Sequence, residues 1–187
     1  DGSIFVVEGD EYDTAFFDKG SKFFHYHPNY VLINNIEFDH ADIFSDVGAV
    51  KAAFQKLLSL IPKNGGVIAN VEDTNVQAVL RELAPNVSLT KVSPLGKVEG
   101  AHITLQNWKR ADDGSLKLRL TSKTWGDLQI TSPLLGDYNV GNIVMAIATI
   151  DALFQANLGS TELPSASALI EAIGSFKGVK RRLELLG

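Results

Sequence analysis

The chain has 187 residues, of which 45% are hydrophobic and 21% are charged, an ordinary globular composition with enough length for a sizeable core. Its formal net charge of −5 argues against nucleic acid or an anionic membrane as the main partner. Cysteine is absent, which excludes disulfides and a thiolate nucleophile, and no apolar run approaches the roughly 20 residues that a membrane span needs.

The first predicted elements are two short apolar runs, each followed by a polar loop. Ser3–Val7 predicts a buried strand that leads into the acidic loop Glu8–Asp13, and Tyr30–Ile33 predicts a second strand that leads into Asn34–Asp42. Between them, the stretch from His25 to Pro28 predicts a packed bend rather than a metal site, because a proline and aromatic residues surround the two histidines.

The loop after the second strand holds two amides, three carboxylates and one imidazole within nine residues. Burying so many polar groups is costly unless they are paired or bind an ion, and oxygen ligands with a neutral imidazole suit Mg²⁺. In a parallel sheet both polar loops open on the same edge, so Glu8 and His40 could reach one ion. The alternative is a solvated strand-to-helix loop in which Asp42 or Ser45 is the N-cap of the next helix.

The middle of the chain alternates helices and strands. We expect helices at Val47–Ile61 and Asn75–Ala84 and strands at Gly66–Val71 and Val87–Val92. This order favours an α/β fold with a mostly parallel sheet flanked by helices and with right-handed crossovers.

The pattern then changes to alternating polar and apolar residues. Ala101–Trp108, Leu116–Leu120 and Leu128–Thr131 predict a small antiparallel three-stranded appendage with turns at Asp112–Gly114 and Thr124–Asp127. We expect the two tryptophans, Trp108 and Trp125, to have a role in core or hairpin packing. A long apolar helix at Val140–Ala156, with Asn139 as its N-cap, and a short helix at Pro164–Ser175 follow.

Two acidic segments connect the chain to a known family. Val7-Glu8-Gly9-Asp10-Glu11-Tyr12-Asp13 and Asn34-Asn35-Ile36-Glu37-Phe38-Asp39-His40 resemble the central-domain motifs of the muramyl (Mur) ligases, and Glu8 to Phe44 resembles the murein-recycling subgroup. The resemblance extends from Ile4 to the end of the chain. It implies a P-loop-NTPase-like domain over residues 1–176 and a junction over residues 177–187. No Gly-x-x-x-x-Gly-Lys-Ser/Thr phosphate loop occurs in the chain. We expect that loop, and the N- and C-terminal domains of such an enzyme, to lie outside it.

The resemblance implies an ATP-dependent ligase of the bacterial cytoplasm that forms an amide bond in peptidoglycan recycling. Its substrates would be UDP-N-acetylmuramate and L-alanyl-γ-D-glutamyl-meso-diaminopimelate, joined through an acyl phosphate with ATP and Mg²⁺ as cofactors. We expect the 187-residue chain alone to be inactive. Two alternatives stay open: a UDP-N-acetylmuramate–L-alanine ligase, and a Mg²⁺-binding module without catalysis.

The resemblance also implies roles for individual residues. Glu8 and His40 would be metal ligands and catalytic groups, and Asn35 would contact phosphate or substrate. The Mur ligases hold adenine with a Gly-x-His-Asn-x-x-Asn motif. Here Asn139 and Asn142 match that motif, and Tyr138 takes the place of its histidine.

The last site residue that the resemblance implies lies close to the end of the chain. Arg182 would lie near the ATP phosphates and act in catalysis. The alternative for this segment, Phe176–Glu184, is a solvated basic tail.

Overall fold

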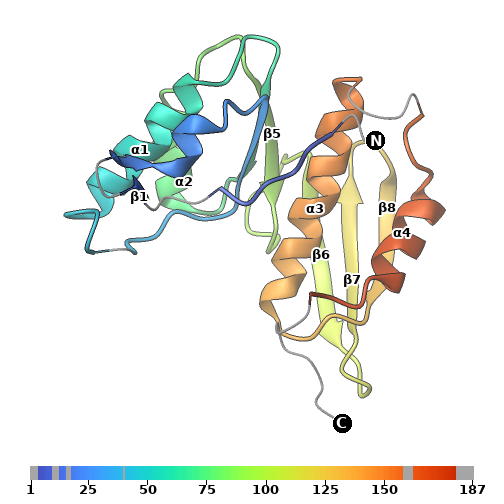
Figure 1. Ribbon diagram of the computed structural model, residues 1–187. Coiled ribbons are helices and arrows are strands. Elements are labelled where there is room, and N and C mark those ends of the chain that lie inside the picture. The colour runs from blue at the N-terminus through green and yellow to red at the C-terminus, as the bar shows by residue number, and fades with distance from the viewer. Residues whose placement is uncertain (1–3, 10–12, 16–17, 40, 158–161, 180–187) are drawn as a thin grey trace. The chain divides into compact units, whose positions relative to one another are not determined.

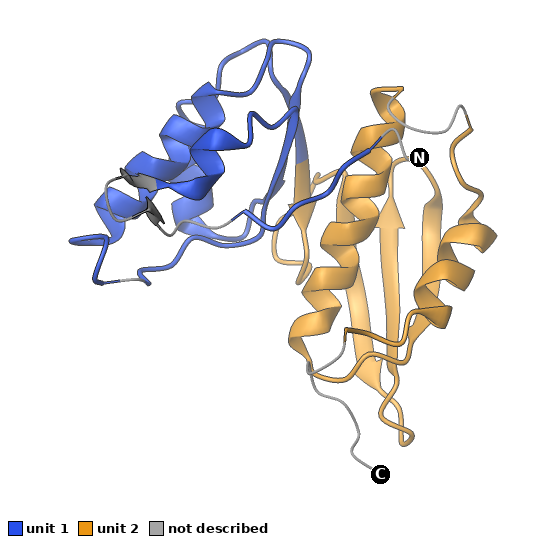
Figure 2. Ribbon diagram, viewed as in Figure 1, with its two compact units in different colours: residues 1–90 blue, residues 91–187 orange. Residues whose placement is uncertain are grey.

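The computed structural model of the chain describes residues 4–9, 13–15, 18–39, 41–157 and 162–179. It divides into two compact units, residues 1–90 and 91–187 (Figure 2). The strands of the larger sheet follow one another in the order β3 (Tyr30–Ile33), β4 (Gly66–Asn70), β5 (Ser88–Ser93), β6 (Ile103–Arg110), β7 (Leu116–Ser122) and β8 (Gly126–Ser132). β5 contributes its first residues to the first unit and its last residues to the second.

In the first unit, parallel strands alternate with helices, as the sequence predicts. β3 and β4 pair in parallel, with Tyr30 opposite Gly66 and Ile33 opposite Ala69. The connection between them carries α1 (Val47–Ser59), and α2 (Thr74–Leu80) follows β4 (Figure 1).

The N-termini of both helices are fixed by aspartates. Asp46 accepts a hydrogen bond from the backbone N–H of Ala49 at 2.9 Å, and Asp73 accepts one from Val76 at 2.7 Å. The N-cap of α1 is therefore Asp46, and the expectation of Asp42 or Ser45 is wrong. An aspartate three residues before a helical N–H has the reach to satisfy it.

The core of the first unit is built around β4. Val67 and Ile68 are 1% exposed and Ala69 is fully buried, so both faces of this strand are covered. Val76 and Val79 of α2 are fully buried as well. A strand covered on both faces has a continuous apolar run instead of an alternating one, which is the pattern of residues 66–70.

The helix α2 ends earlier than its apolar pattern predicts. The backbone N–H groups of Glu82 and Leu83 bond three residues back, to Val79 and Leu80. This tighter spacing is that of a 3₁₀ turn, with which helices commonly terminate. The predicted helix to Ala84 is thus correct in type but four residues too long.

The start of the chain differs from the prediction. Residues 4–9 form no strand, and Phe5 and Val6 are 89% and 82% exposed. The predicted buried strand at Ser3–Val7 is wrong for the part of it that the structure describes. A β-strand needs a neighbour that accepts and donates its backbone hydrogen bonds, and an apolar run does not provide one by itself.

A two-stranded antiparallel sheet and a bend then lead into β3. β1 (Asp13–Ala15) pairs with β2 (Asp18–Ser21), and the 3₁₀ helix η1 (Lys22–His25) follows. His27 has a φ of 47°, and His25 and His27 are both exposed. The bend predicted for His25–Pro28 is therefore present, but the prediction that it is packed is wrong for its two histidines, which face solvent.

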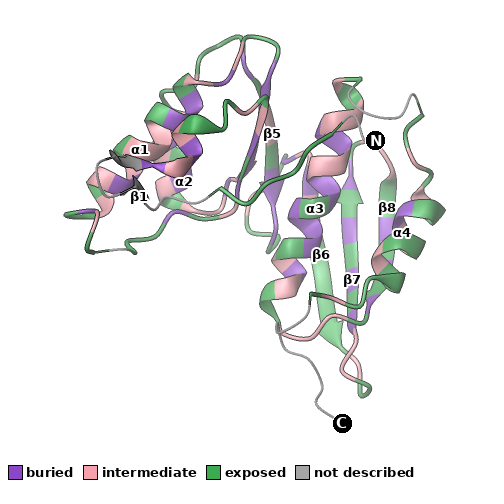
Figure 3. Ribbon diagram, in the orientation of Figure 1, coloured by how far each residue is buried: buried purple, intermediate pink, exposed green. Residues whose placement is uncertain are grey.

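The second unit is an antiparallel sheet with helices on one face. β6, β7 and β8 pair antiparallel, which confirms the three-stranded appendage, and the end of β5 joins β6 in parallel. The two helices α3 (Tyr138–Gln155) and α4 (Ala166–Ser175) lie on the same side of these strands (Figure 1). On β7 the leucines that face the helices are buried and Lys117 and Arg119 are exposed (Figure 3).

The helix α3 is the longest in the described part of the chain. Val140, Val144 and Ile147 are fully buried against the sheet. None of the helices that the structure describes is long and apolar enough to cross a membrane.

Candidate functional site

The polar segment after β3 is anchored to the hydrophobic core by a buried side chain. Ile36 is 1% exposed, and its carbonyl accepts a hydrogen bond from the side chain of Asn75 at 2.8 Å. On either side of it, the amide of Asn35 donates to Glu37 at 3.0 Å, and both of these side chains are exposed. The segment thus presents an amide and a carboxylate to solvent from a fixed backbone. Sequence reasoning missed the anchoring role of Ile36 and Asn75.

Of the two predicted metal ligands, one can be located. Glu8 is exposed in the irregular segment 4–9, so it does not follow a strand as expected. His40 lies outside the described residues. Among the residues that the structure does describe, no three histidines, aspartates or glutamates are grouped so that they could hold a metal ion.

The second predicted site is the segment that opens α3. Gly136 has a φ of 90°, a conformation that favours glycine, and it turns the chain into the helix. The side chain of Asn139 donates to the carbonyl of Leu135 at 2.6 Å and accepts from the side chain of Asn142 at 3.1 Å. Tyr138 is 56% exposed. The structure therefore brings together the three residues of the predicted adenine site.

The two asparagines of this segment have different surroundings. Asn139 is half-buried and uses both ends of its amide in bonds to Leu135 and Asn142. Asn142 is exposed, one turn further along the helix. The hydrogen bond that Asn142 donates to Asn139 restricts the orientation of the Asn142 amide. The expected N-cap role of Asn139 is wrong, because Asp137 precedes the helix and Asn139 lies inside its first turn.

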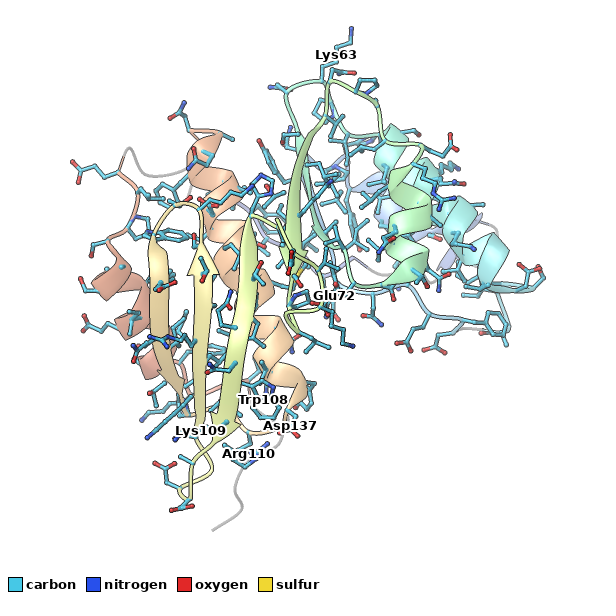
Figure 4. All side chains as sticks on the ribbon, turned by 180° about the vertical axis from the view of Figure 1, so that it is seen from behind. Lys63, Glu72, Trp108, Lys109, Arg110 and Asp137 are labelled. Carbon is cyan, nitrogen blue, oxygen red and sulfur yellow. The ribbon has the colours of Figure 1, made fainter. Side chains whose placement is uncertain are left out.

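An ion pair that sequence reasoning missed joins this segment to the sheet. Arg110, the last residue of β6, pairs with Asp137 and donates to the carbonyl of Gly114 at 3.3 Å (Figure 4). Asp137 makes no side-chain bond to the N–H groups of α3. Nothing in the local pattern of either residue indicates a partner 27 positions away.

At the other end of α3 lies a buried carboxylate. Asp151 is 4% exposed and accepts a hydrogen bond from the hydroxyl of Thr124 at 2.5 Å. Nearby, the backbone N–H of Lys91 donates to Nδ1 of His102 at 3.1 Å. Burial lowers the pKa of His102, and the positive charge of Lys123 lowers it further, although Asp151 opposes this. The imidazole is therefore neutral at pH 7, with its proton on Nε2.

The two tryptophans differ in their packing. Trp125 donates its indole N–H to the carbonyl of Pro164 at 2.9 Å and is partly buried, as the expectation of structural packing requires. Trp108 lies opposite Leu118 in the β6–β7 hairpin but is 36% exposed. It is therefore a hairpin residue that leaves part of its ring at the surface rather than a core residue.

The remaining predicted site residue, Arg182, lies outside the described residues. The described candidates therefore form two groups that belong to different units. Glu8 and Asn35 are in residues 1–90, and the segment from Asp137 to Asn142 is in residues 91–187.

Comparison with known protein families shows which family the chain belongs to. A family model for the Mur ligase middle domain matches residues 1–150. The chain belongs to the Mur ligase family. Its members are ATP-dependent ligases that form C–N bonds, and the motifs in residues 7–13 and 34–40 that suggested this family lie inside the matched range.

Individual Mur ligases are similar to the chain along its whole length. UDP-N-acetylmuramate–L-alanyl-γ-D-glutamyl-meso-2,6-diaminoheptandioate ligase of Escherichia coli is 34% identical over 187 residues, which are 100% of this chain and 37% of that protein. UDP-N-acetylmuramate–L-alanine ligase of Clostridium tetani is 32% identical over 98% of the chain and 35% of its own length. The chain thus spans little more than a third of these curated relatives.

A solved Mur ligase structure has the same fold. The UDP-N-acetylmuramate:L-alanyl-γ-D-glutamyl-meso-diaminopimelate ligase of Neisseria meningitidis matches with a TM-score of 0.71 and 33% identity, over 95% of this chain and 49% of that one. The α/β fold predicted from the sequence is thereby confirmed. The similarity covers both units of this Mur ligase chain.

Proposed function

We propose that the protein is an ATP-dependent ligase that joins UDP-N-acetylmuramate to the tripeptide L-alanyl-γ-D-glutamyl-meso-diaminopimelate. The observation that carries this proposal is the 34% identity, over every residue of the chain, to the E. coli ligase named for these substrates. A ligase of the same name from Haemophilus influenzae, 32% identical over the whole chain, supports it as well. Such an enzyme would act in the bacterial cytoplasm, in the recycling of peptidoglycan.

The proposed reaction has two balanced steps. The γ-phosphoryl group of ATP is transferred to the muramate carboxylate, which gives an acyl phosphate and ADP. The amino group of the tripeptide then attacks the acyl carbon, the C–N bond forms, phosphate leaves with the electron pair of the broken C–O bond, and the nitrogen gives up one proton to water or to the departing phosphate. Both steps bring anions or electron-rich groups together, so neutralising charge is the main physical demand on the protein.

Several residues of the chain would help to neutralise this charge. Glu8 and His40 would hold Mg²⁺, which supplies positive charge at the phosphates when bound. A neutral imidazole and a carboxylate are suitable donors for this ion. Asn35 lies on the anchored segment after β3, and its pairing with Glu37 restricts the orientation of its amide. Arg182 would contribute a further positive charge near the phosphates.

The opening segment of α3 would bind the adenine. An asparagine amide presents a donor and an acceptor side by side, which matches the exocyclic amino group and ring nitrogen at the edge of adenine. The exposed Asn142, held by Asn139, is the side chain best placed to make this contact. Tyr138 is exposed beside it and can stack on the base or donate a hydrogen bond.

A second candidate function has independent support. The 32% identity to the C. tetani UDP-N-acetylmuramate–L-alanine ligase makes L-alanine the alternative amine substrate. Both candidates activate the same muramate carboxylate, so the amine is the one component that separates them.

The test is a substrate competition with the full-length protein. The protein is incubated with ATP, Mg²⁺ and UDP-N-acetylmuramate, together with either tripeptide or L-alanine, and the amide product and released phosphate are measured. We expect product with the tripeptide and little with L-alanine. The reverse preference would support the second candidate. Mg²⁺ binding with no product from either amine would instead indicate a binding module.

A further inference from the structure

The turn between β4 and α2 is restricted by its own polar side chains. The side-chain oxygen of Asn70 accepts a hydrogen bond from the backbone N–H of Glu72 at 2.9 Å, and the side chain of Gln77 donates to the carbonyl of Val71 at 2.6 Å. The aspartate N-cap of α2 adds a third bond within the same turn. Side-chain bonds to nearby backbone groups fix the conformation of a turn. The first turn of α2 is therefore held firmly against the end of β4.

One side chain of this helical turn bonds outside it. Asn75 is half-buried, and its side-chain nitrogen donates to the carbonyl of Ile36 at 2.8 Å, across 39 residues of chain. The bond joins the segments that follow β3 and β4, which are neighbouring parallel strands. Such segments open on the carboxyl edge of a sheet, where α/β proteins place their ligands. Asn75 therefore connects α2 to the polar segment after β3 at this edge.

Ile36 is thereby fixed at two points. Its side chain is 1% exposed and belongs to the same buried cluster as Val76 and Val79 of α2. Its carbonyl accepts the hydrogen bond of Asn75. Packing alone would leave the peptide group after Ile36 free to rotate about a buried side chain, whereas a hydrogen bond defines the direction of its carbonyl. The two contacts together determine the backbone conformation at this position.

The residues on either side of Ile36 depend on that conformation. Asn35 and Glu37 are both exposed, and the amide of Asn35 donates to the carboxylate of Glu37 at 3.0 Å. A change in the backbone at residue 36 would shift one of these side chains relative to the other. Displacements of about 1 Å are enough to slow a reaction between positioned groups, so a site needs supporting contacts behind the groups that touch the ligand. The bond from Asn75 is such a contact for Asn35.

We propose that Asn75 is a positioning residue for the ligase reaction: through the carbonyl of Ile36, it holds the amide of Asn35 where that amide meets the phosphate or the muramate carboxylate. Asn75 itself touches neither. This inference rests on the proposed function, because it adds a residue of α2 to the site that activates the carboxylate. Its loss should therefore impair the first of the two steps and leave the KM for the tripeptide nearly unchanged.

The test measures steady-state kinetics of the full-length protein. Asn75→Asp keeps the size of the side chain but offers no donor to a carbonyl, and it is expected to lower kcat/KM for UDP-N-acetylmuramate about fivefold or more, the value of one hydrogen bond. Asn75→Gln, which keeps the donor, should restore part of the loss. Thr74→Asp puts the same charge on the exposed neighbouring residue, and Gln77→Ala removes a bond inside the turn. Both are controls and should leave kcat/KM unchanged.

A double-mutant cycle separates positioning from a merely structural role. If Asn75 acts through Asn35, the effects of Asn75→Ala and Asn35→Ala on kcat/KM should fall short of multiplying by more than about threefold in the double variant. If Asn75→Ala fails to fold, the cycle is run with Asn75→Asp. Effects that multiply fully, or a kcat/KM that Asn75→Asp leaves unchanged, would overturn this inference and leave the proposed function standing. Absence of ligation by the wild type with either amine would overturn both.

Discussion

The hydroxyl of Thr124 donates to the carboxylate of Asp151 at 2.5 Å, across 27 residues of chain, and ties the β7–β8 turn to the far end of α3. Asp151 is 4% exposed, and Gln155 approaches the same oxygen at 3.5 Å. A charged group so deeply buried depends on its hydrogen bonds, because water cannot replace them. We therefore expect this contact to affect the stability of the fold and not the proposed reaction.

Removing this hydrogen bond should destabilise the fold. Thr124→Val keeps the shape of the side chain but leaves the Asp151 carboxylate without its closest donor, and we expect a loss of about 1–3 kcal/mol in the free energy of unfolding. The matched control is Thr121→Val. Thr121 donates to the exposed Asp127 at 2.9 Å, and water can take the place of the lost hydroxyl there. Urea unfolding monitored by circular dichroism measures the free energy of unfolding of both variants. Equal effects of the two substitutions would contradict the role of burial.

Stability should fall in mildly acidic solution because of His102. Its pKa is lowered from 6.5 in the folded protein, first by burial and then by Lys123. The unfolded chain therefore binds the proton first as the pH falls, so stability is retained above 6.5 and is lost as the pH falls toward the pKa of the folded state.

The measurement for His102 is the free energy of unfolding at about pH 7.5 and about pH 5.5. His102→Asn keeps an acceptor for the N–H of Lys91 but removes the titrating ring, so it should lose less stability over this interval than the wild type. His25→Asn, which changes an exposed histidine of the first unit, serves as the control. A wild-type dependence on pH that His102→Asn leaves intact would show that other groups cause it.

The asparagines of α3 should differ in their effect on ATP. Asn142→Ala in the full-length protein is expected to raise the KM for ATP about fivefold, the value of one ordinary hydrogen bond, with less effect on the muramate and peptide substrates. Asn139→Ala should do the same indirectly, because it releases Asn142. Asn107→Ala, an exposed asparagine opposite Arg119, is the control. Unchanged dependence on ATP concentration in both α3 variants would place the base elsewhere.

The metal site should respond to substitution at two positions. Glu8→Ala and His40→Ala in the full-length protein are each expected to reduce turnover sharply, and the reduction should be strongest at limiting Mg²⁺. The circular dichroism spectrum should not change. His25→Ala and Glu82→Ala, which alter exposed residues of the same unit, are the controls. Near-normal activity of both Glu8 and His40 variants at limiting Mg²⁺ would refute this assignment.

Much of the fold follows from local patterns in the sequence. The run Tyr30–Ile33 is a strand with the predicted bounds, and the alternation along β7 places its leucines on the covered face. These predictions succeed because apolar periodicity and the conformation of nearby residues are properties of short segments. The asparagines of α3 were found from a short motif for the same reason: their spacing of three places them one turn apart on a helix.

The missed features depend on residues that are distant in the chain. The apolar run at Ser3–Val7 has the composition of a strand, but pairing requires a partner, and no local pattern reveals whether one is adjacent. The partners of Arg110 and Asp151 each lie 27 positions away.

The sequence by itself therefore determined the family, the fold class and the order of the helices and strands from β3 onward, and it pointed to the candidate residues. The tertiary structure decided which of these residues meet. A single extra residue in β6 exchanges the two faces of the strand beyond it, because side chains alternate with a period of two. That shift, invisible in the alternating pattern, puts Trp108 and Arg110 on the face of β6 that carries the buried leucines of β7, and Arg110 there meets Asp137 at the start of α3.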